Sequence, residues 1–297
     1  KRFRGYGDMS QPKENYSAKL RAKSMVYFVI CIILTLICLV PIYILIINAT
    51  RKHVDIISSV SFIPGSNLAA NVKKLLNDPM FQFDPFIGFK NSAIIAVGST
   101  VLSVFFSALT AYGLVVYDFK LRGPAYTFIL VVMMVPMQVT SVGFLQFMIK
   151  LGLSDSFIPL IVPTIAAPAI VFFMRQYLKS SFPLDIVEAA RIDGCGEFRT
   201  FLTIAIPMMK PAIAVQAIFA FIQNWNNFYQ PSMILVSRKF EQLTMPMMIN
   251  MLKSNDKIAD YGVIYAGIAL SIIPVVVIYL LLSRFIVEGV ALGGVKE

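Results

Sequence analysis

The sequence predicts an all-α, polytopic membrane protein with six transmembrane helices. Its 297 residues are 58% hydrophobic and only 14% charged, and the mean hydropathy is +0.75. A soluble domain of this length could not bury so much apolar surface, because its own surface needs polar cover. Six apolar runs each approach the roughly 20 residues that a helix needs to cross the hydrocarbon core. The net charge is +10, and the basic residues cluster at the ends of these runs. This placement fits contact with anionic headgroups and a role in membrane topology better than it fits nucleic-acid binding.

The six spans are expected near the apolar runs, with boundaries set to within several residues. Proline and glycine recur inside the runs, so we expect kinked helices packed on neighbours rather than straight independent ones. The first run is too long for a cleavable signal peptide, and no small-residue cleavage site follows it. The transmembrane domain as a whole covers about 26–290, with spans at about 26–48, 92–116, 125–149, 156–178, 204–229 and 262–286.

Basic residues predict the orientation. Seven of them precede the first span, against two acidic residues, so the segment 1–25 is expected in the cytoplasm. Six spans then return the tail 291–297 to the same side. The loop at about 179–203 lies inside as well, and the loops at about 49–90 and 230–261 lie outside. The first external loop is not depleted in lysine and arginine, but long translocated segments follow the charge rule poorly.

Two further predictions concern the external loops. Apolar residues at 68, 72, 75 and 76 have helical spacing, and the expected helix ends at Pro79. This helix is expected to lie at the membrane surface and fill space between spans. The second external loop carries mixed charges and is long enough to reach a soluble partner, since loops of this length are usually functional or disordered.

The residue inventory leaves little room for catalysis. Cys31 and Cys38 lie seven residues apart in one apolar run and are expected as small lipid-phase or core residues. The only histidine, His53, follows a span beside two basic residues, and zinc sites need several nitrogen or sulfur ligands. Acidic residues lie almost wholly outside the spans, so no acid–base pair is available there. No G-x-x-x-x-G-K-[ST] phosphate loop occurs. We therefore expect no catalytic residue, no metal and no cofactor bound by this chain.

The loop at about 179–203 has the most informative pattern. Pro183 and Asp185 suit the first turn of a short helix, and Ala189 and Ala190 are strong helix formers with little bulk. Such a helix would offer a smooth face to another protein. Gly194 allows a turn with positive φ, and a second short helix can follow from about 197 to 202. Either a docking site or an ordinary amphipathic loop accounts for this pattern.

A path for a polar solute needs polar groups inside the spans, where they are costly unless they face a cavity or a partner. Amides both donate and accept hydrogen bonds, and an aromatic face can stack on a sugar. The alternative is interhelical hydrogen bonding, or an interfacial anchor in the case of Trp225. The candidates are Gln138 and Gln146 in the third span and Gln216, Gln223, Asn224, Trp225, Asn226 and Tyr229 in the fifth.

The same loop also carries a family resemblance. Glu188-Ala189-Ala190, two residues, Asp193-Gly194, nine residues and then Ile204-x-Ile206-Pro207 resembles the loop signature of permease subunits of bacterial ABC importers. The family usually has leucine at Ile206 and often alanine at Cys195, and both departures conserve size. Further likeness to the maltose-type, oligosaccharide branch is carried by Val135–Gln138, Leu151–Ser156, Phe173–Leu178, Asn224–Phe228 and Gly289–Lys296.

The resemblance implies a type I ABC importer permease fold and a carbohydrate, di- or oligosaccharide, as substrate. It implies that the loop is a coupling helix seated in a cytoplasmic ATPase: Glu188 would make a charged contact, Ala189 and Ala190 would allow close packing, and Asp193-Gly194 would form the corner. The remaining motif positions are Cys195, Ile206 and Pro207.

Implied partners are two copies of an ATPase that uses ATP and Mg, a second and distinct permease, an extracellular or periplasmic sugar-binding protein, and membrane lipid. The implied location is the bacterial plasma membrane.

Two alternatives remain beside a sugar permease. An importer permease for a non-sugar small solute fits the same loop. A self-sufficient ion-coupled carrier would show inverted repeats or a buried acidic residue, and neither is evident in the sequence.

Overall fold

The computed structural model describes residues 13–254 and 260–293, with side chains described for 21–254 and 260–283. Throughout these ranges the regular structure is helical, with no strand. Parts of the expected cytoplasmic segment 1–25 and tail 291–297, namely residues 1–12 and 294–297, lie outside the described residues.

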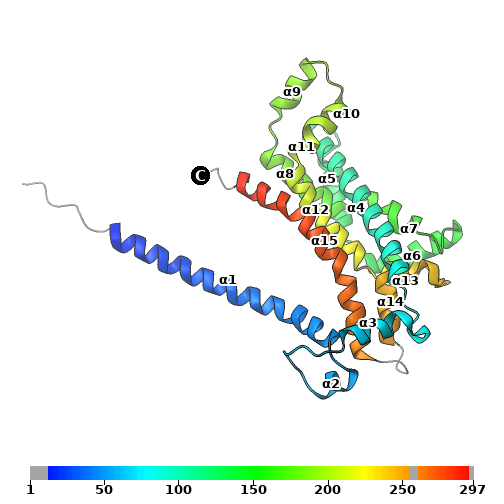
Figure 1. The fold of residues 1–297 in the computed structure, drawn as a ribbon. Coiled ribbons are helices and arrows are strands. Elements are labelled where there is room, and N and C mark those ends of the chain that lie inside the picture. Colours follow the sequence, from blue (N-terminus) through cyan, green and yellow to red (C-terminus); the bar gives the residue numbers. More distant parts are fainter. Residues whose placement is uncertain (1–12, 255–259, 294–297) are drawn as a thin grey trace, which may run out of the picture.

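Five helices form the main bundle and its long arm (Figure 1). Helix α4 is central and packs against α12 and α8. Small side chains on α4, among them Ala96, Ser99, Ser107, Ala108 and Ala111, are fully buried, and small residues let helix backbones approach closely. The five are α1 (Lys13–Ala49), α4 (Pro85–Val116), α8 (Pro168–Ser181), α12 (Lys210–Trp225) and α15 (Tyr261–Gly293).

Among the described residues, four helical segments are long and apolar enough to cross a membrane: Arg21–Ala49, Pro79–Val116, Ile158–Ser181 and Tyr261–Ser283. Two bent pairs raise the number to six if each pair is one span. The first pair is α5 (Arg122–Met133) with α6 (Met137–Lys150), bent by 93°. The second joins Glu197–Met208 to α12 with a bend of 80°. The six expected spans correspond to the larger number.

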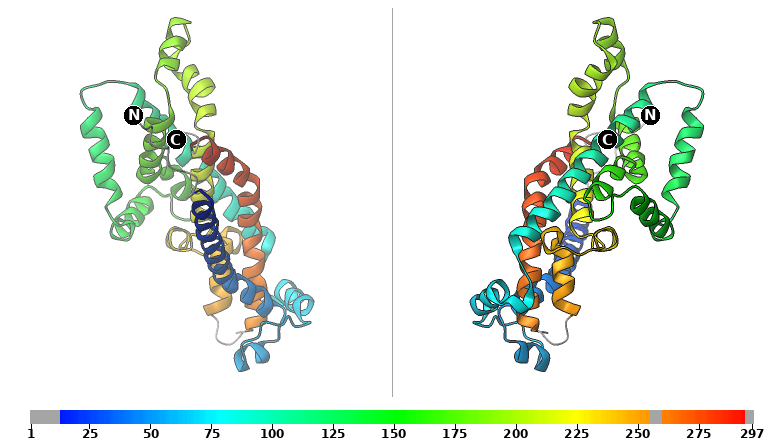
Figure 2. Two further views of the ribbon diagram at one scale, coloured as in Figure 1. Left: turned by 90° about the vertical axis from the view of Figure 1, so that its left-hand side faces the viewer. Right: turned by 90° about the vertical axis from the view of Figure 1, so that its right-hand side faces the viewer.

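The expected spans 125–149 and 204–229 are therefore not continuous helices with a kink but sharply broken ones. Pro136 lies in the first break, and its missing N–H and fixed φ favour a sharp bend over a continued helix. In the second, a π-helical turn η3 (Phe201–Ala205) and α11 (Ile206–Met208) precede α12, with Pro207 and Pro211 on either side of the bend. Figure 2 shows α5 at one side of the bundle, where it packs against α8. The span expected at 156–178 is built from α7 (Ile158–Ile161), η2 (Val162–Ile165) and α8.

The long loops fold onto the bundle. The helix expected to end at Pro79 is α3 (Leu68–Asn77), flanked by α2 (His53–Ser58) and η1 (Pro79–Phe81). The loop expected at 230–261 is largely helical rather than open, because Met245, Met247, Met248 and Leu252 pack into a core cluster with Leu75 and Phe81. Its elements are α13 (Tyr229–Ile234), η4 (Phe240–Gln242) and α14 (Met245–Ser254).

The end of α1 meets the start of α15 at a crowded point that we call the α1–α15 junction, formed by Ala49–His53, Asn71, Lys74 and Asp260–Gly262. Asn71 Nδ2 donates to the carbonyls of Ala49 at 2.8 Å and Arg51 at 2.9 Å. Lys74 pairs with Asp260 at 2.8 Å. His53, expected only to flank a span, stacks on Tyr261 with ring centroids 5.2 Å apart.

Beyond the junction, α1 leans away from the rest of the molecule (Figure 1). Residues 21–43 are all exposed, including Cys31 and Cys38. Lipid or a partner helix must cover this apolar surface, because its exposure to water would be unfavourable.

Candidate functional site

The loop with the expected docking pattern is a helical hairpin at one extreme end of the molecule, opposite the α1–α15 junction (Figures 1 and 2). It consists of α9 (Asp185–Ile192) and α10 (Glu197–Thr200). Between them Gly194 has a φ of +76°, the positive value expected from the sequence. The turn is closed by hydrogen bonds from the Gly194 N–H to the Arg191 carbonyl at 3.0 Å and from the Cys195 N–H to the Ala190 carbonyl at 2.9 Å.

One face of α9 is anchored to the bundle. Val187 is 1% exposed and joins a core cluster with Tyr112 of α4, Phe182 and Phe201. Ala190, three residues further on the same face, is 7% exposed. Of the two alanines expected to offer an outward face, Ala190 therefore lies on the buried face of α9 with Val187, and Ala189 is exposed.

The opposite face is open. Glu188, Ala189, Asp193 and Gly194 are exposed as expected, and Cys195 is half-buried. Two apolar residues that the sequence reasoning missed are exposed as well: Ile192 of α9 is 87% exposed and Phe198 of α10 is 59% exposed. We call Glu188, Ala189, Ile192 and Phe198 the outer face. The sequence could have indicated this face. Ile192 lies off the buried stripe of Val187 and Ala190, where a helix that packs only inward would carry a polar residue.

Ile206 and Pro207, which end the loop motif, are not on the outer face. Ile206 packs against the same core cluster as Val187, and Pro207 is exposed at the entry to α12. These two residues shape the chain where α11 meets α12.

A charged group of three residues, which we call the clasp, joins α9, α10 and the end of α4. Arg191 donates from Nε to Glu197 Oε1 at 2.7 Å and from Nη2 to Oε2 at 3.1 Å. Tyr117, the residue that caps α4, donates its O–H to Glu197 Oε2 at 2.7 Å. The Arg191 guanidinium carbon lies 5.7 Å from the centre of the Tyr117 ring.

The three clasp residues lie outside the expected spans, and the hydrogen bonds between them change their pKa values. Hydrogen bonds from Arg191 and then Tyr117 lower the pKa of the Glu197 carboxyl below its usual 4.5. Burial, followed by the bond to Glu197, raises the pKa of Tyr117 to about 12. At neutral pH Glu197 is therefore an anion that accepts from both partners.

The expected solute-path residues other than Trp225 lie at the surface of the chain or are half-buried. Gln138, Gln146, Gln223, Asn226 and Tyr229 are exposed, and Gln216 and Asn224 are half-buried. The Tyr229 hydroxyl shares a hydrogen bond of 2.8 Å with the Ser141 hydroxyl of α6, and Asn224 Nδ2 donates to the Ala220 carbonyl of its own helix.

Trp225 belongs to the core. It is 2% exposed, its Nε1–H donates to the Ser271 carbonyl of α15 at 3.0 Å, and its ring stacks between Phe89 and Phe221. With 2% of the residue exposed, little of the ring is left to stack on a sugar or to anchor the helix at an interface.

Two of the path candidates, Trp225 and Asn226, line a common cavity. It measures about 290 Å³ and lies where α12 ends beside α14 and α15. Asn250 and Lys253 add polar groups, and its full lining is Trp225, Asn226, Phe228, Met245, Pro246, Ile249, Asn250, Lys253 and Ser271.

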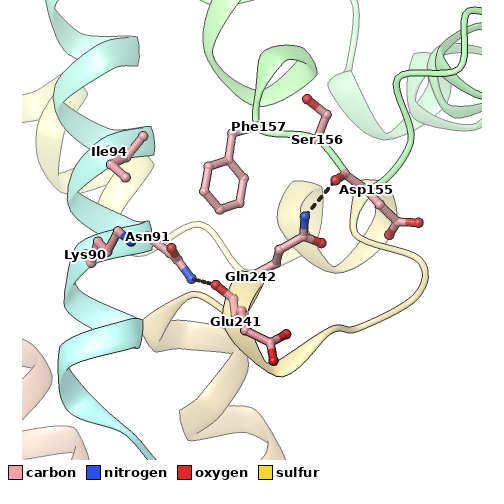
Figure 3. Close-up of a pocket in the computed structure, with 8 residues that line it drawn as sticks. All are labelled: Lys90, Asn91, Ile94, Asp155, Ser156, Phe157, Glu241 and Gln242. Atoms are coloured by element: carbon pink, nitrogen blue, oxygen red, sulfur yellow. Dashed lines mark hydrogen bonds between the residues drawn. The ribbon is translucent and has the colours of Figure 1, made fainter.

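A second cavity of about 360 Å³ opens where the start of α4 meets the loop before α7 and η4 (Figure 3). Asn91 Nδ2 donates to the Glu241 carbonyl at 2.8 Å, and Gln242 Nε2 donates to the Asp155 carbonyl at 2.9 Å. The Ser237 N–H donates to Asp155 Oδ1 at 2.8 Å and lowers the pKa of that carboxyl. Lys90, Ile94, Ser156 and Phe157 complete the lining.

Metal ligands do not gather in the part of the chain that the structure describes: no group of three or more histidine, cysteine, aspartate or glutamate side chains could hold an ion there.

Comparison with known proteins gives a consistent result. Residues 99–291 match the family model described as binding-protein-dependent transport system inner membrane component. The arabinooligosaccharides transport system permease protein AraQ of Bacillus subtilis (strain 168) is 35% identical over 268 residues, which cover 89% of this chain and 92% of that protein. The lactose transport system permease protein LacG of Rhizobium radiobacter is 33% identical over 215 residues, 72% of this chain and 77% of that protein.

A more distant relative is the sn-glycerol-3-phosphate transport system permease protein UgpE of Pectobacterium atrosepticum, 28% identical over 264 residues, 88% of this chain and 93% of that protein. Among solved structures, a bacterial ABC transporter involved in the import of the acidic polysaccharide alginate superimposes with a TM-score of 0.72 at 23% identity, over 89% of this chain and 96% of that one. At that identity the likeness establishes the fold.

Proposed function

Because this chain belongs to the family of binding-protein-dependent transport system inner membrane components, we propose that a separate ATPase drives it through the outer face of α9. The chain is a membrane-spanning permease subunit of an ABC importer for carbohydrate. The observation that carries the substrate class is the 35% identity to an arabinooligosaccharide permease over nearly the whole chain.

The proposed substrate is a di- or oligosaccharide, since relatives above 30% identity are named for arabinooligosaccharides and lactose. A non-sugar small solute is the second candidate, and the relatives named for sn-glycerol-3-phosphate favour it. Uptake of labelled oligosaccharide and of glycerol phosphate by the same reconstituted complex separates the two.

Permeases of this family work with an ATPase, a binding protein and a second permease. For this chain we propose two ATPase copies that use ATP and Mg, a distinct second permease, and no ATP hydrolysis by the chain itself, which has no phosphate loop. The proposed setting is a bacterial plasma membrane with the α9–α10 end in the cytoplasm. Seven basic residues before the first span support that orientation.

The outer face suits an ATPase cleft because it combines one charge with apolar surface. Glu188 supplies a carboxylate, Ala189 permits close approach, and Ile192 and Phe198 are large apolar side chains left in water. Burial of such side chains gives most of the affinity in a protein interface, and the charge fixes the partner's orientation. When ATP binding brings the two ATPase copies together, the docked α9 moves with them, and the solute path alternates between its two openings. This works only if the ATP-bound ATPase has different affinities for the two permease conformations.

The test is a charge placed on the outer face. Ile192→Asp should abolish recovery of the ATPase with the tagged permease and stop ATP-driven uptake. Ile57→Asp is a matched control, because Ile57 is also exposed but lies on α2 at the other end. The ATPase is identified by its hydrolytic activity in the wild-type complex. Full recovery and uptake with Ile192→Asp would refute docking on this face.

A second experiment separates the importer from a self-sufficient carrier. Liposomes that contain this chain alone, with ATP inside, should accumulate no oligosaccharide, whereas liposomes with the complete complex and its binding protein should. Uptake by the lone chain would contradict the multi-subunit function.

A further inference from the structure

Movement of α9 must reach α4, because α4 is the helix against which α8 and α12 pack. The covalent route between them is indirect. From α9 the chain runs through Gly194 and Gly196, and a Cβ at either glycine would meet no atom within 4 Å. The turn is closed by its own backbone hydrogen bonds, but neither glycine has a side chain to pack against α4, so this route adds no contact between the two helices.

The apolar route is also limited. Val187 anchors α9 in the core cluster, but hydrophobic contact is not directional. One aliphatic side chain against aromatic rings resists separation better than it resists rotation or sliding. Something else must fix the angle between α9 and α4.

The clasp fixes the orientation of α9 relative to α4. Glu197 accepts three hydrogen bonds, two from Arg191 at the end of α9 and one from Tyr117 at the end of α4. The paired bonds from the planar guanidinium fix orientation as well as distance. One carboxylate on α10 therefore holds the last turn of α9 to the cap of α4.

Tyr117 is well placed to pass on displacement. Its ring packs edge-on against Tyr112 with centroids 6.1 Å apart, and Tyr112 contacts Phe182 and Phe201 in turn. The Tyr112 hydroxyl is buried without a hydrogen-bond partner within the described residues. The clasp thus lies on the aromatic part of the core, where α4, α8 and η3 meet.

We propose that the Arg191–Glu197–Tyr117 clasp is the element that converts movement of the coupling helix α9 into movement of α4. The inference rests on the proposed function, since it presupposes that an ATPase moves α9. All three side chains are positioning residues, and the outer face, not the clasp, makes the contact with the ATPase. Loss of the clasp should therefore leave docking intact and waste the ATP that is hydrolysed.

The experiment measures sugar molecules transported per ATP hydrolysed by the complete complex in liposomes with its binding protein. Tyr117→Phe removes one hydroxyl and keeps the ring, and Glu197→Gln removes the charge at nearly constant shape. Each should lower the ratio by roughly threefold to tenfold, the range expected for a half-exposed charged hydrogen bond. Recovery of the ATPase and its basal activity should stay at the wild-type level.

The exchange Arg191→Glu with Glu197→Arg restores the ion pair in reverse, and it should recover part of the ratio that either single change abolishes. Arg199→Gln is the matched control, because Arg199 is a charged residue of the same helix outside the clasp, and it should change nothing. An unchanged ratio in both Tyr117→Phe and Glu197→Gln would overturn the proposal. Loss of ATPase recovery in both variants would also overturn it, because the clasp would then only hold the loop together.

The two proposals fail in distinguishable ways. If the wild-type permease recovers no ATPase, or if Ile192→Asp recovers it fully, the docking function is wrong. If docking behaves as expected and the clasp variants transport normally, only the clasp inference is wrong.

Discussion

Gly194→Ala tests whether the left-handed turn between α9 and α10 matters for docking. Gly194 has a φ of +76°, and an added Cβ would meet no atom within 4 Å. Steric clash is thereby excluded, and the cost is that of the backbone alone. For a residue with a Cβ the left-handed conformation costs about 1–2 kcal/mol, which is a factor of roughly 5 to 30 in the population of the native turn.

Gly196→Ala is the matched control. Gly196 also has open space around a Cβ, but its φ of −68° and ψ of 149° suit any residue. This substitution should be neutral or stabilise the loop by about 0.4–1 kcal/mol, because alanine restricts the unfolded chain. Gly194→Asn should fall between the two, because asparagine tolerates the left-handed region.

The assay is titration of purified ATPase onto the permease complex in liposomes, read as the concentration that gives half-maximal ATP-driven uptake. Gly194→Ala should raise that concentration by up to roughly 30-fold, and Gly196→Ala should leave it unchanged. Equal behaviour of the two alanine variants would refute the reasoning, because it would mean that the turn's geometry does not limit docking.

Three further predictions concern stability and pH. Trp225→Phe should destabilise the protein by about 1–3 kcal/mol, seen as a lower Tm, because the Ser271 carbonyl loses its donor. The KM for sugar should not change, and a raised KM would indicate that Trp225 contacts the sugar. Gly262→Ala should cost about 1–3 kcal/mol, since its Cβ would lie 2.6 Å from the Arg51 carbonyl oxygen; Gly267→Ala, which meets only side-chain ends, should cost less, and the reverse order of Tm values would contradict this. The lowered pKa of Glu197 means that the clasp stabilises the fold at pH above the carboxyl's ordinary value and that this stability is lost as pH falls through the folded value. The Tm difference between wild type and Glu197→Gln should therefore shrink in acid, and a difference that grows in acid would contradict it.

Hydropathy and turn chemistry are local, and they located most of the fold. The apolar runs coincide with helical segments, and the positive φ of Gly194 follows from the absence of a side chain. The sharpness of the bends in the two broken spans could not be predicted from these local properties. Proline at 136 signals an interruption, but the 93° bend depends on where α5 and α6 find partners, which is not a local property.

The candidate site shows the same division. The sequence located the loop, yet Ala190 lies on the buried face of α9 and Ala189 is exposed. The sequence suggested that Trp225 could stack on a sugar. In the fold its ring packs against Phe89 and Phe221, and its Nε1–H donates to the Ser271 carbonyl. The clasp escaped notice for a related reason: Arg191 and Glu197 are close in sequence, but Tyr117 is not, and only the folded chain brings the three together.

The α1–α15 junction has a consequence for biosynthesis. Arg51 and His53 emerge early from the ribosome, whereas Gly262 and Tyr261, which they contact, emerge some 200 residues later. Contacts of such long sequence separation form late and slowly. The C-terminal end of α1 therefore stays without these contacts until translation is almost complete. A nascent chain that stalls before α15 would leave that end exposed, and it is there that quality-control proteases should recognise an unfinished subunit.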